Sequence, residues 1–246
     1  MKLYINGKFF SQEDISKPSA SPLEVSVYEE AVLQFIRDWQ SGQPYFTLFT
    51  SGSTGLPKRI EAPRAYLALS AQHTIDYLQL FPHFKSLVCL NTDFIAGKMM
   101  LVRSLILDMP TYVVAPHLNP FEVYSTAFDF AAVVPLQLER WLKNPIYIQK
   151  INEFKKIIVG GAKLNAKLKQ ACLSLQTDIY ETYGMTETYS HIALRNLKSE
   201  VFYTVIYKDL QLDTDHRSCL KVKGALTQDQ WLQTNDIVHI VNERQF

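Results

Sequence analysis

The sequence is poor in glycine and carries almost no net charge. It has nine glycines in 246 residues, about half of the usual frequency of roughly 7%, which excludes collagen-like and flexible-linker proteins. Its 25 basic and 24 acidic side chains give a net charge of +1, so no global attraction to nucleic acid or to an anionic membrane is expected. We therefore expect each of the few glycines to meet a local requirement of the backbone.

Cysteine clusters and long apolar runs are also missing. Cys89, Cys172 and Cys219 lie far apart without a C-x-x-C pair, which favours buried free thiols over a disulfide or a zinc site. No apolar run reaches the roughly 18–20 residues that span a bilayer, and the N-terminus lacks the apolar segment of a signal peptide. We expect a cytoplasmic protein without membrane insertion, and the sequence indicates no particular oligomeric state.

Short apolar runs that alternate with helical segments predict an α/β fold. The expected architecture is a mostly parallel sheet flanked by helices, with a smaller antiparallel β-rich portion at the C-terminal end. An Asn6-Gly7 hairpin turn and an amphipathic helix around 28–39, which Gly42 ends, come first. The expected strands are YFTLF (45–49), SLVCL (86–90), TYVV (111–114), FAAVV (130–134), KIIV (156–159), VFYTVIY (201–207), CLKVKG (219–224) and DIVHIV (236–241). The expected helices are 63–78, with Pro63 in the first turn, 95–107, 136–142 and 166–175.

The most informative motif follows the run YFTLF directly. It consists of Thr50, Ser51, Gly52, Ser53, Thr54, Gly55, Leu56, Pro57 and Lys58. Its two glycines permit a tight turn whose N–H groups converge on an anion, its four hydroxyls add donors, and Lys58 adds a positive charge. The spacing of a Walker A loop is absent. We predict a phosphate-binding loop between a strand and a helix, the alternative being an ordinary Ser/Thr/Gly surface turn.

FTSGSTGLPK resembles the phosphate-binding loop of the adenylate-forming superfamily, which includes acyl-CoA ligases, luciferases and the adenylation domains of peptide synthetases. Three further stretches resemble motifs of that family in the same order. They are Val159-Gly160-Gly161-Ala162 (its GGA turn), Tyr183-Gly184-Met185-Thr186-Glu187-Thr188 (its YGxTE) and Thr234-Asn235-Asp236 (its TxD). The resemblance implies ATP, Mg²⁺, CoA and a small-molecule carboxylate as ligands.

The resemblance also implies a role for individual residues. Lys58 and its loop would hold the β- and γ-phosphates, and Thr186 would contact the α-phosphate. Glu187 would coordinate Mg²⁺, a hard cation that prefers oxygen ligands. Tyr183 would stack on adenine, and Asp236 would accept hydrogen bonds from the ribose hydroxyls. Taken singly, each has a simpler alternative: a surface Glu, a core Tyr, an Asp in a turn.

Backbone neighbours complete the implied nucleotide site. The residues expected to border the adenine and the phosphates are Gly160, Gly161, Ala162, Glu181, Gly184 and Met185.

A narrower resemblance is to the o-succinylbenzoate–CoA ligases of menaquinone biosynthesis. It rests on NTDFIAGKMMLVRSL (91–105), VVPLQ (133–137) and YETYGMTETYSHIALR (180–195). It implies activation of o-succinylbenzoate to an acyl-adenylate and then to a CoA thioester. Because this acid has two carboxylates, its pocket should contain a cation or several hydrogen-bond donors. The candidates are Phe94, as an aromatic wall, and Lys98, Arg103, Ser190 and His191.

Alternatives stay open for these residues and for the substrate. Phe94 also suits a core position. Lys98 and Arg103 lie about 140° apart on a helix, and both also suit an exposed helix face. Another aromatic or aliphatic acid, or a nucleotide-binding module without turnover, would fit the same motifs. Activation of an amino acid is less favoured, since the order is Asp93-Phe94 rather than Phe-Asp.

The chain departs from the family pattern at both ends. Only 49 residues precede the phosphate loop and ten follow Asp236, whereas the family continues through a ribose-contacting Arg, a hinge and a small mobile domain with the adenylation lysine. We therefore expect that mobile domain to be absent and the chain alone to be impaired. We divide the chain into a hairpin and helix (1–44), an α/β nucleotide-binding core (45–190) and a β-rich portion of the same domain (191–246).

Overall fold

A nine-stranded mixed sheet forms the centre of the molecule in the computed structural model, which describes residues 1–17, 25–49 and 59–246. In spatial order its strands are β11 (Thr204–Val205), β10 (Ser190–Asn196), β9 (Asp178–Met185), β8 (Lys156–Val159), β7 (Phe130–Val133), β5 (Ser86–Val88), β6 (Thr111–Val113), β1 (Leu3–Ile5) and β2 (Lys8–Phe10). The interior pairs from β1 to β9 are parallel, and β2, β10 and β11 add antiparallel edges. The predicted mostly parallel sheet is confirmed.

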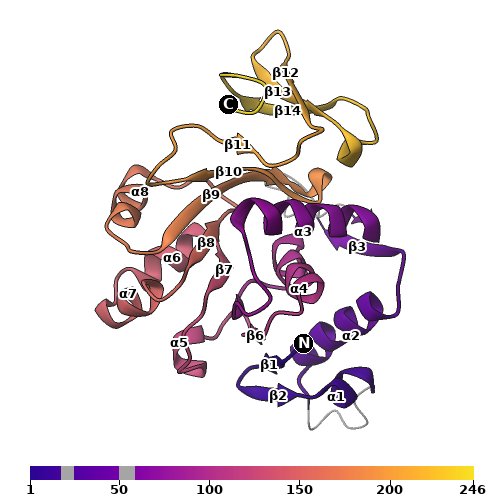
Figure 1. Ribbon diagram of the computed structural model, residues 1–246, viewed down its shortest axis with the longest axis vertical. Helices are drawn as coiled ribbons and strands as arrows, with labels where there is room; N and C mark the ends of the chain where they lie inside the picture. The colour runs from indigo at the N-terminus through magenta and orange to yellow at the C-terminus, as the bar shows by residue number, and fades with distance from the viewer. Residues whose placement is uncertain (18–24, 50–58) are drawn as a thin grey trace.

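Helices cover both faces of this sheet (Figure 1). One face packs on α1 (Gln12–Ser16), α2 (Val27–Gln40), α3 (Arg64–Leu78) and α4 (Ile95–Leu107). The other packs on α5 (Pro120–Val123), α6 (Pro135–Trp141), α7 (Pro145–Ile151) and α8 (Ala166–Leu173). Because apolar side chains are buried on both faces, central strands such as β7 are apolar throughout. The predicted helices 95–107, 136–142 and 166–175 are confirmed with small shifts of their ends, whereas α7 is an unpredicted helix.

The run YFTLF does not join the main sheet. It forms β3 (Tyr45–Phe49), which pairs antiparallel with β4 (Arg59–Pro63) in a separate two-stranded sheet. The physical reason is visible in its burial, since Phe46 and Leu48 are buried while Tyr45 is exposed, the alternation of a strand with one covered face. Residues 50–58 are therefore flanked by two paired strands and not, as predicted, by a strand and a helix. The predicted helix 63–78 is confirmed as α3, which begins one residue later. Pro63 ends β4 and precedes α3 as its N-cap.

The C-terminal part is antiparallel, as predicted. A three-stranded sheet of β12 (Gln211–Thr214), β13 (Cys219–Lys223) and β14 (Leu232–Ile237) lies beyond β10 and β11 (Figure 1). Two short 3₁₀ turns are present: η1 (Thr186–Thr188) lies between β9 and β10, and η2 (Ala225–Thr227) lies between β13 and β14. The strand predicted at 201–207 is shorter in the structure, where only Thr204–Val205 pairs. The strand predicted at 236–241 begins earlier in the structure, at Leu232, and ends at Ile237. Pairing with β13 at Val222↔Leu232 places β14 earlier, despite its polar residues.

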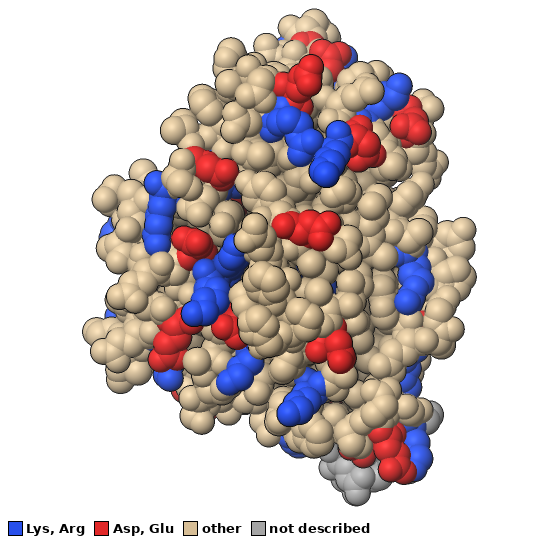
Figure 2. Space-filling model, viewed as in Figure 1, with Lys and Arg blue, Asp and Glu red and all other residues tan. Residues whose placement is uncertain are grey.

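The surface carries charges of both signs. Figure 2 shows basic and acidic side chains interspersed over one face, and neither sign dominates there. No helix in the described part of the chain is long and apolar enough to cross a membrane.

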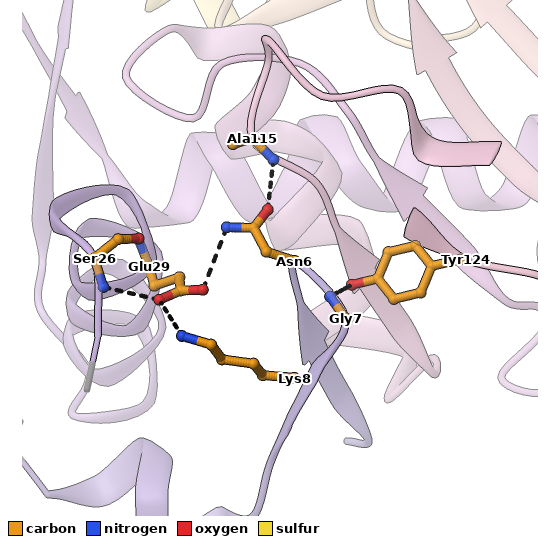
Figure 3. A network of polar contacts seen from close by, with 7 residues as sticks. All are labelled: Asn6, Gly7, Lys8, Ser26, Glu29, Ala115 and Tyr124. Atoms are coloured by element: carbon orange, nitrogen blue, oxygen red, sulfur yellow. Dashed lines mark hydrogen bonds and ion pairs between the residues drawn. The ribbon is translucent and has the colours of Figure 1, made fainter. Parts of the chain in front are cut away.

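The N-terminal hairpin is fixed to the end of β6 by its turn. Asn6 and Gly7 have φ angles of 49° and 86°, which confirms the predicted two-residue turn. The Asn6 side chain accepts a hydrogen bond from the backbone N–H of Ala115 at 2.9 Å, and the Gly7 N–H donates to the hydroxyl of Tyr124 at 3.1 Å. Figure 3 shows both contacts. The turn thus anchors β1 and β2 against the parallel strands.

A buried carboxylate ties the same hairpin to α2. Glu29 is 2% exposed and accepts hydrogen bonds from Asn6 (3.3 Å), Lys8 (3.3 Å) and the backbone of Ser26 (2.8 Å) (Figure 3). Burial acts against ionisation of Glu29, but these donors outweigh it and lower the pKa of the carboxyl group. The charge of Glu29 therefore stabilises the junction between α2 and the sheet.

Replacing Glu29 by Gln keeps the shape of this side chain but removes its charge. We expect the free energy of unfolding to fall by about 1–3 kcal/mol, because three donors lose an ionised acceptor. Urea denaturation would measure this. Glu139→Gln is the control: it removes an exposed ion pair with Lys143, for which we expect a loss of at most about 1 kcal/mol. Equal losses in the two variants would contradict the assigned role of Glu29.

Candidate nucleotide and acid site

The pairing of β9 with β10 brings the YGMTET motif next to two candidate acid-binding residues. In this antiparallel pair Met185 lies opposite Ser190, and Gly184 lies opposite His191. A Cβ atom on Gly184 would stand 2.3 Å from the Cα of His191, so only glycine allows the two backbones to approach this closely. Candidates for the nucleotide and for the acid thus share one strand pair.

The turn η1, between these strands, presents Glu187 to solvent. Thr188 fixes the turn, because its hydroxyl donates to the carbonyl of Ser190 at 2.8 Å and accepts from the backbone of Met185 at 3.2 Å. Thr186 is 9% exposed. Glu187 is exposed, makes no hydrogen bond or ion pair with a described residue, and lines a hollow together with Trp231. A carboxylate without partners suits a hard cation such as Mg²⁺.

Tyr183 and Asp236, from two separate motifs, meet in the structure. The Tyr183 hydroxyl donates to the Asp236 carboxylate at 2.7 Å. The Tyr183 ring stands edge-on to Phe246, with 5.1 Å between centroids, and lies 6.0 Å from the ring of Tyr203. Burial and the charge of Asp236 raise the pKa of Tyr183, which therefore stays a donor. The predicted adenine and ribose residues are adjacent; their contacts with a nucleotide stay predictions.

The GGA turn lies against β9 beside Tyr183. A Cβ atom on Gly160 would stand 2.3 Å from the hydroxyl of Thr182, the residue before Tyr183, and Gly161 has a φ angle of +83°. The positive φ angle of Gly161 favours glycine, whereas a side chain at position 160 would have to displace the hydroxyl of Thr182. Ala162 is exposed next to them. The structure thus places the GGA turn directly after β8 and against Thr182, the residue that precedes Tyr183.

Glu181 is engaged by the protein itself. Its carboxylate is 2% exposed and binds the backbone N–H of Leu164 (3.2 Å), Lys169 (3.1 Å) and Arg195. Burial acts against ionisation of Glu181, but these partners prevail and lower its pKa. Arg195 in turn lies over the ring of Tyr203, 4.8 Å from its centroid. Glu181 thus supports the aromatic group around Tyr183, and its predicted nucleotide contact stays a prediction.

The phosphate loop lies outside the described residues. The roles of Thr50, Ser51, Gly52, Ser53, Thr54, Gly55 and Lys58 therefore stay predictions. The residues that flank the loop, Phe49 and Arg59, face each other across the β3–β4 pair. Phe49 and Arg59 therefore lie side by side.

Two acid-site candidates lie at the start of α4. Phe94 is the N-cap residue of α4 and is 42% exposed, so it does not occupy a core position. The ammonium group of Lys98 donates to the backbone carbonyl of Asp93 at 3.0 Å, and burial lowers its pKa. Gly97 sits close to the preceding loop, since a Cβ atom there would stand 2.4 Å from the carbonyl oxygen of Asn91. Contacts of Phe94 and Lys98 with an acid stay predictions.

Arg103 lies deep inside the protein, so the alternative of an exposed arginine is wrong. It is 1% exposed, and its Nη2 donates to the hydroxyl of Ser190 at 3.1 Å. No described carboxylate forms an ion pair with it. Burial lowers the pKa of Arg103 to about 10, which keeps it a cation near neutral pH. The structure thus connects two acid-site candidates, Arg103 and Ser190, by a hydrogen bond, and Arg103 is a buried positive charge.

His191 is a buried neutral imidazole beside this cation. It is 6% exposed, and its Nε2 lies 3.0 Å from the hydroxyl of Thr74. That hydroxyl donates its proton to the carbonyl of Ser70 at 3.1 Å, so we assign the proton of His191 to Nε2. Burial, and then the charge of Arg103, hold the pKa of His191 well below 6.5.

The sequence reasoning missed Thr74 and Ser70 as site residues. Both project from α3 into the interior, and both are fully buried. A signal was present, because two hydroxyl residues four positions apart shared a helix face with Leu67, Ala71 and Leu78.

The burial of His191 makes stability depend on pH. An imidazole that stays neutral in the folded protein takes up a proton when the chain unfolds below about pH 6.5, so the free energy of unfolding should fall as the pH decreases from 7 to 5. His191→Gln should reduce this fall by up to about 2 kcal/mol, the linkage of one proton over that interval. Denaturation at several pH values would measure it, with the exposed His117→Gln as control. An unchanged pH dependence in His191→Gln would show that the imidazole is not held neutral.

Comparison with known proteins defines the class. A family described as AMP-binding enzyme matches residues 3–240, and the chain belongs to this family. A solved structure of an acyl-CoA synthetase (AMP-forming)/AMP-acid ligase II-like protein from Dyadobacter fermentans is similar to this chain, with 38% sequence identity and a TM-score of 0.83. The match covers 94% of this chain and 66% of that chain. The predicted superfamily and fold class are confirmed.

The more specific relatives are 2-succinylbenzoate–CoA ligases. The enzyme of Oceanobacillus iheyensis is 28% identical over 152 residues, or 59% of this chain, and that of Listeria innocua is 25% identical over 198 residues, or 78%. The chain spans 31% and 41% of the lengths of these two relatives. The o-succinylbenzoate coenzyme A synthetase of Bacillus subtilis, solved with ATP and magnesium ion, shares the fold, with a TM-score of 0.67, 21% identity, and 81% of this chain and 48% of that chain covered.

Proposed function

We propose that this chain carries the ATP-binding and acid-binding part of an acid–CoA ligase whose substrate is o-succinylbenzoate. Membership of the AMP-binding family supports the reaction class, and the relatives named as 2-succinylbenzoate–CoA ligases support the acid. The observation that carries the choice of acid is the buried Arg103, which has Ser190 but no carboxylate as a partner among the described residues.

A buried guanidinium group without a counter-ion is costly, since burial of an unpaired charge costs several kcal/mol. An acid with two carboxylates offers a remedy. One carboxylate reacts with ATP, and the other stays ionised and pairs with Arg103. A simple aliphatic monocarboxylate would enter beside Arg103 without supplying the missing negative charge. The site therefore favours a dicarboxylate.

The other residues divide the work of activation between them. Attack of a carboxylate on the α-phosphate of ATP brings two anions together, so the site must offset their repulsion. Bound Mg²⁺ would neutralise phosphate charge, and the unpartnered carboxylate of Glu187 suits it. Tyr183 and Asp236 would hold the nucleoside, since one Asp236 oxygen makes no hydrogen bond with a described residue. The attack would form the acyl-adenylate and release pyrophosphate, and CoA would then attack the acyl carbon and release AMP.

The ATP half of the proposal predicts a specific loss in Glu187→Gln. The amide keeps the shape of the side chain but lacks the charge that Mg²⁺ requires. We expect the affinity for ATP·Mg²⁺ to fall about tenfold, which corresponds to about 1.4 kcal/mol, while the melting temperature stays unchanged. Titration calorimetry at fixed Mg²⁺ would measure the affinity.

A matched control is Glu153→Gln, which changes an exposed glutamate paired with Lys150 at the end of α7. Its ATP·Mg²⁺ affinity should equal that of the parent chain. Equal affinity in Glu187→Gln would show that Glu187 does not hold the metal, and the absence of ATP·Mg²⁺ binding by the parent chain would contradict the proposed function itself.

A further inference from the structure

A buried polar cluster lies between α3, α4 and the last strands of the main sheet. Its members are Ser70, Thr74, Arg103, Ser190, His191 and Tyr207. Five buried side-chain nitrogen or oxygen atoms in the described part of the chain lack a hydrogen-bond partner, and three of them belong to this cluster: Ser70 Oγ, Arg103 Nε and Tyr207 Oη. Because native proteins rarely leave such atoms unpaired, three in one place indicate an acceptor that binds there.

Tyr207 is held firmly in this position. Its ring packs on His73 of α3, with 4.2 Å between centroids, and is 1% exposed. The preceding residue, Ile206, donates its N–H to the carbonyl of Ile192 in β10 at 3.0 Å. Burial raises the pKa of Tyr207 to about 12, while the neighbouring hydroxyl of Ser70 and the charge of Arg103 lower it. The hydroxyls of Ser70 and Tyr207 thus lie near each other, although neither forms a hydrogen bond of normal geometry. The hydroxyl of Tyr207 is therefore a protonated donor beside a cation.

We propose that Tyr207, together with Ser70, determines the specificity of the acid site by donating hydrogen bonds to the second, unreacted carboxylate of the substrate. This inference rests on the proposed function. Arg103 Nε and one N–H of Nη2 form one edge of the guanidinium group, which matches the two oxygens of a carboxylate. The two hydroxyls satisfy the remaining lone pairs of that carboxylate. Ser190 is the half-buried member of the cluster, and the proposal places the entry of the acid on its side.

This arrangement selects against acids that lack the second carboxylate. With such an acid, Arg103 Nε and the hydroxyls of Ser70 and Tyr207 would gain no acceptor from the substrate. A site built to hydrogen-bond a substrate group rejects the analogue without it far more strongly than an apolar pocket does. The hydroxyl of Tyr207 should therefore influence the choice between acids and contribute little to the stability of the unliganded protein.

The test compares two ligands and two matched tyrosine variants. The ligands are o-succinylbenzoate and 4-oxo-4-phenylbutanoate, which lacks only the ring carboxylate. In Tyr207→Phe, we expect the preference for the diacid to fall about tenfold or more, since a hydrogen bond to a charged group is lost, with an unchanged melting temperature. Ser70→Ala should act in the same direction. Tyr124→Phe removes a buried hydroxyl that does have partners, Val113 and Gly7, so it should lower the melting temperature and keep the preference.

Each result of the calorimetric titrations has a separate meaning. A preference for the diacid that is lost in Tyr207→Phe supports the inference. A preference that survives in Tyr207→Phe and in Ser70→Ala overturns the inference and leaves the proposed function standing. Equal binding of the two acids by the parent chain overturns the choice of a dicarboxylate. Binding of neither acid overturns the proposed function and the inference together.

Discussion

The close approach of β9 and β10 at Gly184 and His191 is the constraint on which the site depends. It allows the chain to turn through η1 directly after the long strand β9, so that Glu187 faces solvent while Ser190 and His191 return into the interior. A side chain at position 184 would force the strands apart. The nucleotide candidates Tyr183 and Thr186 and the acid candidates Ser190 and His191 are therefore positioned by a single strand pair. Gly97, in α4, likewise lies where two stretches of backbone meet.

The second determinant is the balance of charge behind that strand pair. Arg103 brings a positive charge into an interior where His191 stays neutral and where the nearest partners are hydroxyls. Burial of this charge costs free energy, which hydrogen bonds offset in part and a bound anion would offset further. Glu29 and Glu181 show the opposite solution, since each buried carboxylate has several donors around it. Arg103 differs from them in having no ion-pair partner among the described residues, and this difference is why we propose it as a binding position.

Much of this arrangement could be predicted from the sequence, because it is encoded locally. Central strands such as β7 are continuously apolar, and the motifs at 159–162, 183–188 and 234–236 are contiguous. The burial of Arg103 had a local signal as well, since α4 is apolar on all sides around it, which is typical of a buried helix. Tyr207 had none: it reaches Arg103 only because the chain after β11 packs across α3. The pairing of β3 with β4 likewise had no local signal, because the apolar run 45–49 does not show which strand it will pair with.

The most direct test of the account is a crystal structure of this chain with a non-hydrolysable analogue of the o-succinylbenzoyl adenylate. The account predicts adenine against the ring of Tyr183, the ribose hydroxyls on Asp236, and the free carboxylate within hydrogen-bonding distance of Arg103 Nε and of the hydroxyls of Tyr207 and Ser70. A free carboxylate that points to solvent, with the buried cluster unchanged around Arg103, would contradict it.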